Sequence, residues 1–202
     1  MEKSVDNVNK PMHISASALT KGKSRVRKKQ REGVTVLKWI TNRNEISFPK
    51  LMEVYAQTNL KTAREEWPDL PEGFALEKVE RDFNDYLRDV FFPTEGAAYA
   101  LWELEGCYVS ALRIEPYKDG LLIEALETAP DQRRKGYGRA LVQAVMHSVE
   151  YKKLYSHVEK RNSASLKLHE SCGFVRELDL AVYIDGSVNY RSCTMSFQRV
   201  KE

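Results

Sequence analysis

The stretch APDQRRKGYGRAL, residues 129–141, decides how this chain folds. An apolar run typical of a strand precedes it, and an amphipathic segment, residues 138–151, follows it. In that segment Leu141, Val145 and Val149 recur at four-residue steps, which places them on one stripe of a helix. The stretch therefore predicts a strand, a turn and a helix in direct succession.

Two glycines mark the turn, Gly136 and Gly138, and neither has a Cβ to obstruct the backbone N–H groups. The N-terminus of a helix carries unpaired N–H donors and a partial positive charge, so a phosphate binds there readily. Four cations surround this turn: Arg133, Arg134, Lys135 and Arg139. Because cations are unfavourable at a helix N-terminus, the sequence predicts a bound anion, with a Lys- and Arg-rich surface turn as the alternative.

Two widespread nucleotide-binding motifs are excluded at this turn. A mononucleotide P-loop requires G-x-x-x-x-G-K-[ST], and the chain contains no such run. A Rossmann unit requires a third glycine shortly after Arg139 and parallel βαβ units from the start of the domain, and the sequence has neither.

Periodicity and turn residues predict the other elements. Helices are expected from Ser47, with Pro49 in the first turn, and over residues 76–91 and 163–172. Strands are expected over residues 34–40, 97–104, 107–115, 120–128 and 154–159. A final hairpin is expected to pair residues 178–184 with residues 188–200 through Asp185-Gly186. Short turns predict an antiparallel meander first, followed by alternating helix and strand, which is an α+β order.

Two motifs together resemble the GNAT superfamily of N-acetyltransferases. The run RRKGYGRAL, residues 133–141, resembles the R/Q-x-x-G-x-G/A signature, whose loop holds the acetyl-CoA pyrophosphate in that family. The run NSASLKLHESCGF, residues 162–174, looks like the family's N-x-x-S/A-x-x-L-Y-x-x-x-G-F element. The resemblance covers residues 34–202 and implies a mixed, mostly antiparallel central sheet flanked by helices, with a β-α-β-α-β-β C-terminal half.

The same resemblance implies an acetyl-CoA site without a metal ion. Backbone groups of Leu126 and Thr128 are expected to pair with pantetheine like an added strand, and the Leu126 N–H to stabilise the oxyanion. Asn162 is expected to hold the pantetheine arm, and an N-cap role is compatible with this. The full set expected at the cofactor is Leu126, Glu127, Thr128, Arg133, Arg134, Lys135, Gly136, Tyr137, Gly138, Arg139, Asn162 and Ser165.

Glu124 is the candidate general base, because a protonated amine must lose a proton before it attacks. By strand alternation Leu122, Glu124 and Leu126 are expected to share one face, where desolvation would raise the carboxyl pKa. Alternatively, Glu124 binds the substrate ammonium or lies at the exposed sheet edge. Glu127 is expected on the other face and ranks lower.

His169 stands where the family usually has Tyr, so it is the candidate general acid. The alternative is a neutral substitution in an enzyme that needs no dedicated acid. Cys172 has no adjacent base and is interpreted as a small core residue rather than a nucleophile.

The composition is ordinary for a globular protein: 202 residues, 42% hydrophobic and 30% charged. No apolar run reaches membrane-spanning length, the N-terminus lacks the apolar core of a secretory signal, and three widely spaced cysteines suit a reducing compartment. We therefore expect a cytoplasmic protein. Residues 1–33 carry nine basic residues against three acidic ones and are expected to be a disordered, solvated tail; a polyanion contact is the alternative.

The sequence thus predicts direct acetyl transfer from acetyl-CoA to a primary amine of a small molecule, peptide or protein. The partners expected are acetyl-CoA and the amine acceptor, without membrane or nucleic acid, for a monomer or homodimer. The main alternative is a catalytically idle CoA-binding regulatory module, and a polyanion-binding protein led by the tail ranks third.

Overall fold

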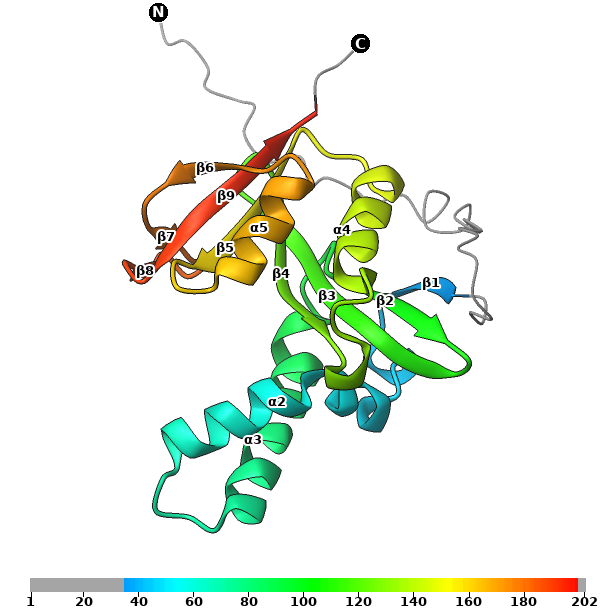
Figure 1. Cartoon of the computed structure of the whole chain (residues 1–202), viewed down its shortest axis with the longest axis vertical. Coiled ribbons are helices and arrows are strands. Elements are labelled where there is room, and N and C mark those ends of the chain that lie inside the picture. The colour runs from blue at the N-terminus through cyan, green and yellow to red at the C-terminus, as the bar shows by residue number, and fades with distance from the viewer. Residues whose placement is uncertain (1–34, 200–202) are drawn as a thin grey trace, which may run out of the picture.

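A computed structural model describes residues 35–199, so the expected tail, residues 1–33, lies outside the described residues. The described chain forms a seven-stranded sheet of order β1-β2-β3-β4-β5-β9-β6, with helices on both faces (Figure 1). All neighbouring strands are antiparallel except β4 and β5, which run parallel. The predicted α+β class, with a mostly antiparallel central sheet, is confirmed.

The first half holds one strand and two long helices before the sheet continues. Their bounds are β1 Thr35–Ile40, α2 Phe48–Glu66 and α3 Glu72–Tyr86, with a short 3-10 helix, Arg43–Glu45, before α2 and a π-helical turn, Leu87–Phe91, after α3. The predicted helix start is confirmed, since Ser47 is the N-cap of α2 and a proline occupies its first turn. The end of the second helix before Pro93 is also as predicted.

The predicted meander is confirmed as three antiparallel strands joined by short turns. They are β2 Ala98–Leu104, β3 Cys107–Tyr117 and β4 Gly120–Thr128. The second half then alternates as α4 Tyr137–Ser148, β5 Lys153–Glu159, α5 Ser163–Ser171, β6 Val175–Leu178 and β9 Ser192–Gln198.

The predicted final hairpin through Asp185-Gly186 is confirmed, but its pairing is interrupted. Nearest the turn, the short strands β7 Ala181–Val182 and β8 Val188–Asn189 pair in a separate two-stranded sheet, and further along Leu178 of β6 lies opposite Thr194 of β9. Strand β9 also pairs with β5, so it lies between β5 and β6. Consecutive residues of β9 are buried on both of its faces, and a strand buried in this way belongs in the sheet interior, with a neighbour on each side.

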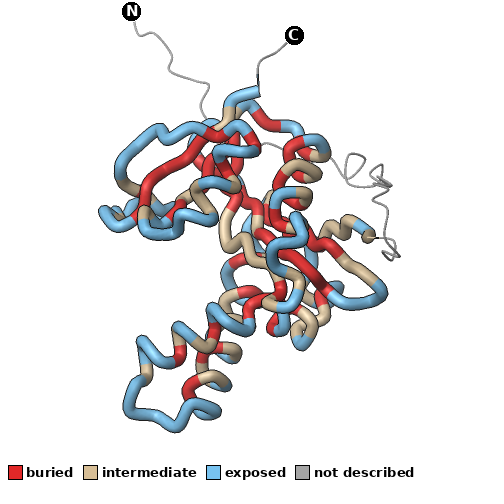
Figure 2. Tube along the Cα trace, viewed as in Figure 1, coloured by how far each residue is buried: buried red, intermediate tan, exposed pale blue. Residues whose placement is uncertain are grey.

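Two apolar layers cover the two faces of the sheet. One packs α4 against the inward residues of β2 to β5, among them Leu112, Ile114 and Ile123. The other packs α2 and the π-helical turn against Tyr99, Leu101 and the rest of that face. In Figure 2 the chain in both layers is mostly coloured as buried. The far ends of α2 and α3 project from the sheet, and most of their residues are exposed.

Candidate active site

The parallel pairing of β4 with β5 stops early. It joins residues 121–123 of β4 to residues 154–156 of β5, although β4 continues to Thr128 (Figure 1). On the side facing β5, residues 124–128 therefore have no partner strand in the described chain. Such an edge presents backbone N–H and C=O groups that can pair with an added extended molecule.

A β-bulge interrupts β4 in this unpaired part. Arg113 of β3 lies opposite Glu124, but Ala111, two residues earlier, lies opposite Glu127, so β4 contains one extra residue. Ala125 takes the left-handed conformation with φ 49°. The extra residue changes which face each following side chain occupies.

The predicted shared face of Leu122, Glu124 and Leu126 is therefore wrong. Leu122 packs with Tyr117 and Tyr155, whereas Leu126 packs against the core beneath α4. Alternation holds only as far as Glu124, because the bulge at Ala125 reverses it.

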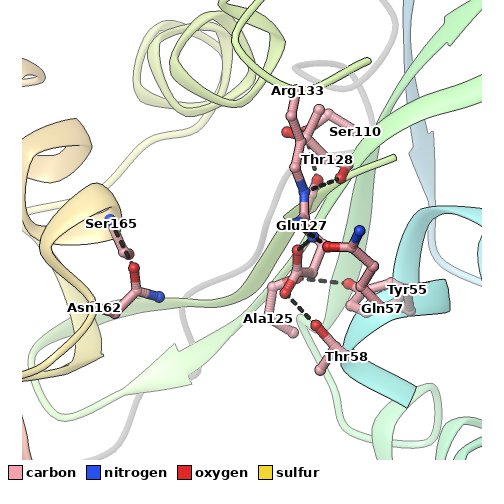
Figure 3. A network of polar contacts seen from close by, with 10 residues as sticks. All are labelled: Tyr55, Gln57, Thr58, Ser110, Ala125, Glu127, Thr128, Arg133, Asn162 and Ser165. Carbon is pink, nitrogen blue, oxygen red and sulfur yellow. Dashed lines mark hydrogen bonds and ion pairs between the residues drawn. The ribbon is translucent and has the colours of Figure 1, made fainter. Parts of the chain in front are cut away.

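Tyr55 of α2 holds the bulge in place. Its hydroxyl donates a hydrogen bond of 2.6 Å to the Ala125 carbonyl (Figure 3). The same hydroxyl accepts a hydrogen bond of 3.3 Å from the Tyr99 hydroxyl. Both tyrosines are buried. Burial raises the pKa of Tyr99 to about 12, so its hydroxyl stays protonated and can donate.

The glycine turn lies beside the end of β4, as predicted. Gly136 is the N-cap of α4 with φ 88°, and no side chain caps this terminus. Gly138 is required for close packing: a Cβ there would lie 3.1 Å from Thr128 Oγ1 and 3.3 Å from Leu168 Cδ1. The first N–H groups of α4 are thus positioned for an anion next to the free edge of β4.

Arg133 forms different contacts from the other cations at the turn. It donates to the Thr128 carbonyl at 3.1 Å, to Glu127 at 3.3 Å and to Gln57 of α2 (Figure 3). Glu127 in turn accepts a hydrogen bond of 2.6 Å from the Thr58 hydroxyl. Arg133 and Glu127 therefore fasten the turn to α2.

The remaining three cations form no ion pair with the described residues. Lys135 donates to Gln132 at 3.0 Å, Arg139 reaches the Ser171 carbonyl at 3.4 Å, and Arg134 is exposed. Their charge therefore surrounds an uncapped helix N-terminus, which favours an anion there.

Asn162 and Ser165 lie at the N-terminal end of α5, apart from the group at the end of β4 (Figure 3). Asn162 is the N-cap, and its side chain accepts the Ser165 N–H at 3.0 Å. The N-cap role is therefore present.

His169 is buried, with 2% of its surface exposed. Its Nδ1 lies 2.9 Å from the Ser165 carbonyl, so Nδ1 carries the proton, and its ring packs edge-on against Phe174 at 5.3 Å. Nε2 has no partner among the described residues. Burial lowers the pKa of His169, so the ring is neutral with an unprotonated Nε2, a form that has no proton to donate from that atom.

The sheet face opposite α4 carries a polar cluster that sequence reasoning missed in part. Glu124 forms an ion pair of 2.6 Å with Arg113, and the nearby Glu115 is 6% exposed. Burial first, then the charge of Glu124 and a hydrogen bond with it, raise the pKa of Glu115 to about 7. In the sequence, the alternation of Arg113 and Glu115 with Leu112 and Ile114 predicts that Arg113 and Glu115 share a face of the sheet. It does not predict that this face is buried.

Cys172 belongs to the apolar core beneath α4, which confirms its interpretation as a packing residue. Within residues 35–199 no three His, Cys, Asp or Glu side chains gather where they could hold a metal ion. None of the helices in this part of the chain combines the length and apolar character needed to span a membrane.

Comparisons with known proteins agree with this geometry. The sequence profile described as "Acetyltransferase (GNAT) family" matches residues 59–174. An acetyltransferase from Thermus thermophilus superposes with a TM-score of 0.54 at 18% identity, covering 82% of this chain and 97% of that chain. The ribosomal-protein-S18-alanine N-acetyltransferase from Escherichia coli gives 0.52 at 16% identity, covering 81% and 93%.

The PaiA N-acetyltransferase from Thermoplasma acidophilum, solved in complex with coenzyme A, gives a TM-score of 0.52 at 11% identity. That match covers 81% of this chain and 99% of the other. The comparison with curated proteins found no match. At these identities the solved structures establish the shared fold, while the profile spans more than half of the chain and establishes the family. The chain belongs to the GNAT family of acetyltransferases.

Proposed function

We propose that this protein transfers an acetyl group from acetyl-CoA directly to a primary amine of a small molecule, peptide or protein. One observation carries the proposal: the unpaired edge of β4, residues 124–128, ends beside the uncapped N-terminus of α4. An extended pantetheine arm and a diphosphate need these two features next to each other. Three unpaired cysteines support a cytoplasmic location for the protein.

Acetyl-CoA would lie with its diphosphate on the N–H groups of the turn and of the first turn of α4. Arg134, Lys135 and Arg139 would supply charge there, whereas Arg133 holds the turn to α2. Backbone groups of Leu126 and Thr128 would pair with the pantetheine, and Asn162 and Ser165 would lie along its other side.

Chemistry then requires a neutral amine and a stabilised oxyanion. Glu124, 21% exposed at its side chain, accepts the proton of the acceptor ammonium, directly or through water. The amine nitrogen attacks the thioester carbonyl, and the Leu126 N–H, presented by the bulged strand, donates to the oxyanion. The C–S bond breaks, and the thiolate receives the second proton that the nitrogen sheds.

His169 is not assigned a proton-donating role in this mechanism, because its Nε2 is unprotonated and buried. A thiolate is a stable leaving group at neutral pH, so the reaction does not depend on a dedicated acid. The buried His169 in place of Tyr is also the observation that favours the second candidate, a CoA-binding module without catalysis.

The test is acceptor-dependent release of free thiol from acetyl-CoA. The panel contains monoamines, diamines and longer polyamines, lysine-containing peptides and peptides with free N-termini, with coenzyme A affinity measured by calorimetry in parallel. Thiol release with one class supports the proposal and names the acceptor. Tight coenzyme A binding without release across the panel supports the idle module, and absence of coenzyme A binding contradicts both.

A further inference from the structure

We propose that Glu115 and Glu124 form a carboxyl pair that shares one proton, so that Glu115 sets the proton affinity of the base Glu124. Glu115 is a positioning residue in this account, because it acts on the acceptor amine only through Glu124. The inference rests on the proposed acetyl transfer and deepens it by identifying a second residue that controls its pH dependence.

Strand geometry brings the two carboxyls to one face. Along β3, Arg113 and Glu115 alternate with apolar residues that face α4, and Glu124 lies opposite Arg113 in the register with β4. Glu115 is nearly sealed from water, at 6% exposed, whereas the Glu124 side chain is 21% exposed. The inner carboxyl is thus the one that resists ionisation, and the outer one is accessible to an amine.

Arg113 keeps the pair from being fully protonated. Its guanidinium lies 2.6 Å from Glu124 and stacks on the rings of Tyr86, at 4.9 Å, and Phe91, at 5.5 Å. One largely buried cation compensates one carboxylate but not two, so the second charge is disfavoured: the pair holds one proton below about pH 7 and is ionised above it. The pKa of about 7 for Glu115 agrees with this arrangement.

The tyrosines and the histidine around the pair remain neutral near pH 7. Tyr86 of α3, Tyr99 of β2 and Tyr55 of α2 interact with Arg113, and burial raises the pKa of each. His157 of β5 interacts with Glu124 and with Lys118, and burial lowers its pKa. The Glu115–Glu124 pair therefore accounts for proton uptake at this site near neutrality.

The protons gained and lost in the reaction balance without any further reactant. The ionised pair takes one proton from the acceptor ammonium, and that proton resides between Glu115 and Glu124 while the C–N bond forms and the C–S bond breaks. The nitrogen sheds its second proton to the departing sulfur. The pair then releases its proton to water, which restores the ionised form.

The experiment is the pH dependence of kcat/KM for wild type, Glu115→Gln and Glu124→Gln. Wild type is expected to lose activity below about pH 7, where the pair is protonated. Glu115→Gln removes the like charge beside Glu124, so its acidic limb should move by at least about one unit toward low pH. Glu124→Gln should lose most activity at every pH.

Glu103→Gln is the matched control. Glu103 is also a strand carboxylate in a 2.6 Å ion pair, with Lys38, and its side chain is 18% exposed. It should leave the profile unchanged. An acidic limb that stays in place in folded Glu115→Gln, or a wild-type limb far below pH 7, would overturn the inference.

A direct titration separates this inference from the proposed function and does not require a folded variant. Side-chain carboxyl resonances of ¹³C-labelled glutamates in wild type should include one that titrates near pH 7. If the protein binds coenzyme A but acetylates no amine, the proposed function fails, and this resonance alone decides whether the proton is shared. Titration of every glutamate near its ordinary value would overturn the pair.

Discussion

At the scale of single residues, the candidate site contains residues with an unusual backbone conformation or an unusual charge state. Gly136 and Gly106 are a useful comparison, because both have positive φ, 88° and 82°, and a Cβ at either would meet nothing within 4 Å. Only Gly136 lies at the uncapped start of α4. Substituting each glycine in turn therefore separates the effect of backbone strain on stability from the effect on ligand binding.

Gly136→Ala and Gly106→Ala should each lower the free energy of unfolding by about 1–2 kcal/mol, the strain of a side chain in the left-handed region. Only Gly136→Ala should also weaken coenzyme A binding, since strain there displaces the N–H groups that would hold the diphosphate. Chemical denaturation and calorimetry measure the two effects. Equal coenzyme A affinity in both variants would contradict the placement of the diphosphate.

Glu115→Gln should make the protein more stable at pH 8 by about 1–3 kcal/mol. The folded-state pKa of Glu115, about 7, lies above the ordinary value of 4.5, so the folded protein binds more protons between these values. Wild-type stability therefore falls as pH rises from 4.5 to 7, and the glutamine variant lacks this loss. The difference should disappear near pH 4.5 in denaturation curves; a pH-independent difference would contradict the raised pKa.

At the scale of elements, the bulged strand β4 connects the proposed proton acceptor, Glu124, to the proposed oxyanion donor, the Leu126 N–H. Glu124 stands before Ala125 and Leu126 after it, so the bulge places their side chains on opposite faces of the sheet. The Glu124 carboxylate then lies on the same side of the sheet as α3. The edge of β4 from Glu124 to Leu126 has no partner strand in the described chain. Tyr55 fixes this arrangement from a separate helix.

Tyr55→Phe should destabilise the protein by about 1–3 kcal/mol, because it leaves the Ala125 carbonyl without its buried hydroxyl partner. It should also lower kcat more than coenzyme A affinity, since the loosened bulge misplaces the Leu126 N–H. Tyr99→Phe is the matched control: it removes the 3.3 Å bond to Tyr55 but keeps the bond to Ala125. An equal loss of kcat in both variants would argue against a specific role for the bulge.

At the scale of the whole molecule, the sheet consists of two parts joined by a short parallel contact. Within the described residues, strand pairing between the meander β1 to β4 and the strands β5, β9 and β6 is confined to residues 121–123 and 154–156. Acetyl-CoA in the proposed position would bridge both parts, while the far ends of α2 and α3 would remain free of it (Figure 1).

Hydrogen exchange should therefore slow in a defined pattern when coenzyme A binds. Added protection is expected at residues 124–139 and at the start of α5, and little change at residues 67–74, the loop after α2 with the first residues of α3. A saturating ligand also raises global stability, by about 2.7 kcal/mol at 100 times its Kd. Protection concentrated at residues 67–74 would show that the ligand binds elsewhere.

Local patterns in the sequence predicted most of the elements and one side of the site. The stripe of Leu141, Val145 and Val149 and the pair Gly136 and Gly138 predicted α4 and its turn correctly. These signals were sufficient because helix periodicity, capping and positive φ depend on residues a few positions apart. The same signals predicted the final hairpin but not that β9 also pairs with β5, since that pairing depends on partners distant in the chain.

The sequence by itself determined the family, the sheet meander and the turn with its surrounding cations. Each of these depends on residues that lie close together in the chain. Only the tertiary structure decided that Ala125 bulges, that Arg133 fastens the turn to Gln57, and that Glu115 lies buried beside Glu124. Tyr55 and Ala125 are 70 residues apart, as the separation in their hydrogen bond shows. The face that a side chain occupies, and the burial that sets a pKa, depend on such distant contacts, which no local periodicity contains.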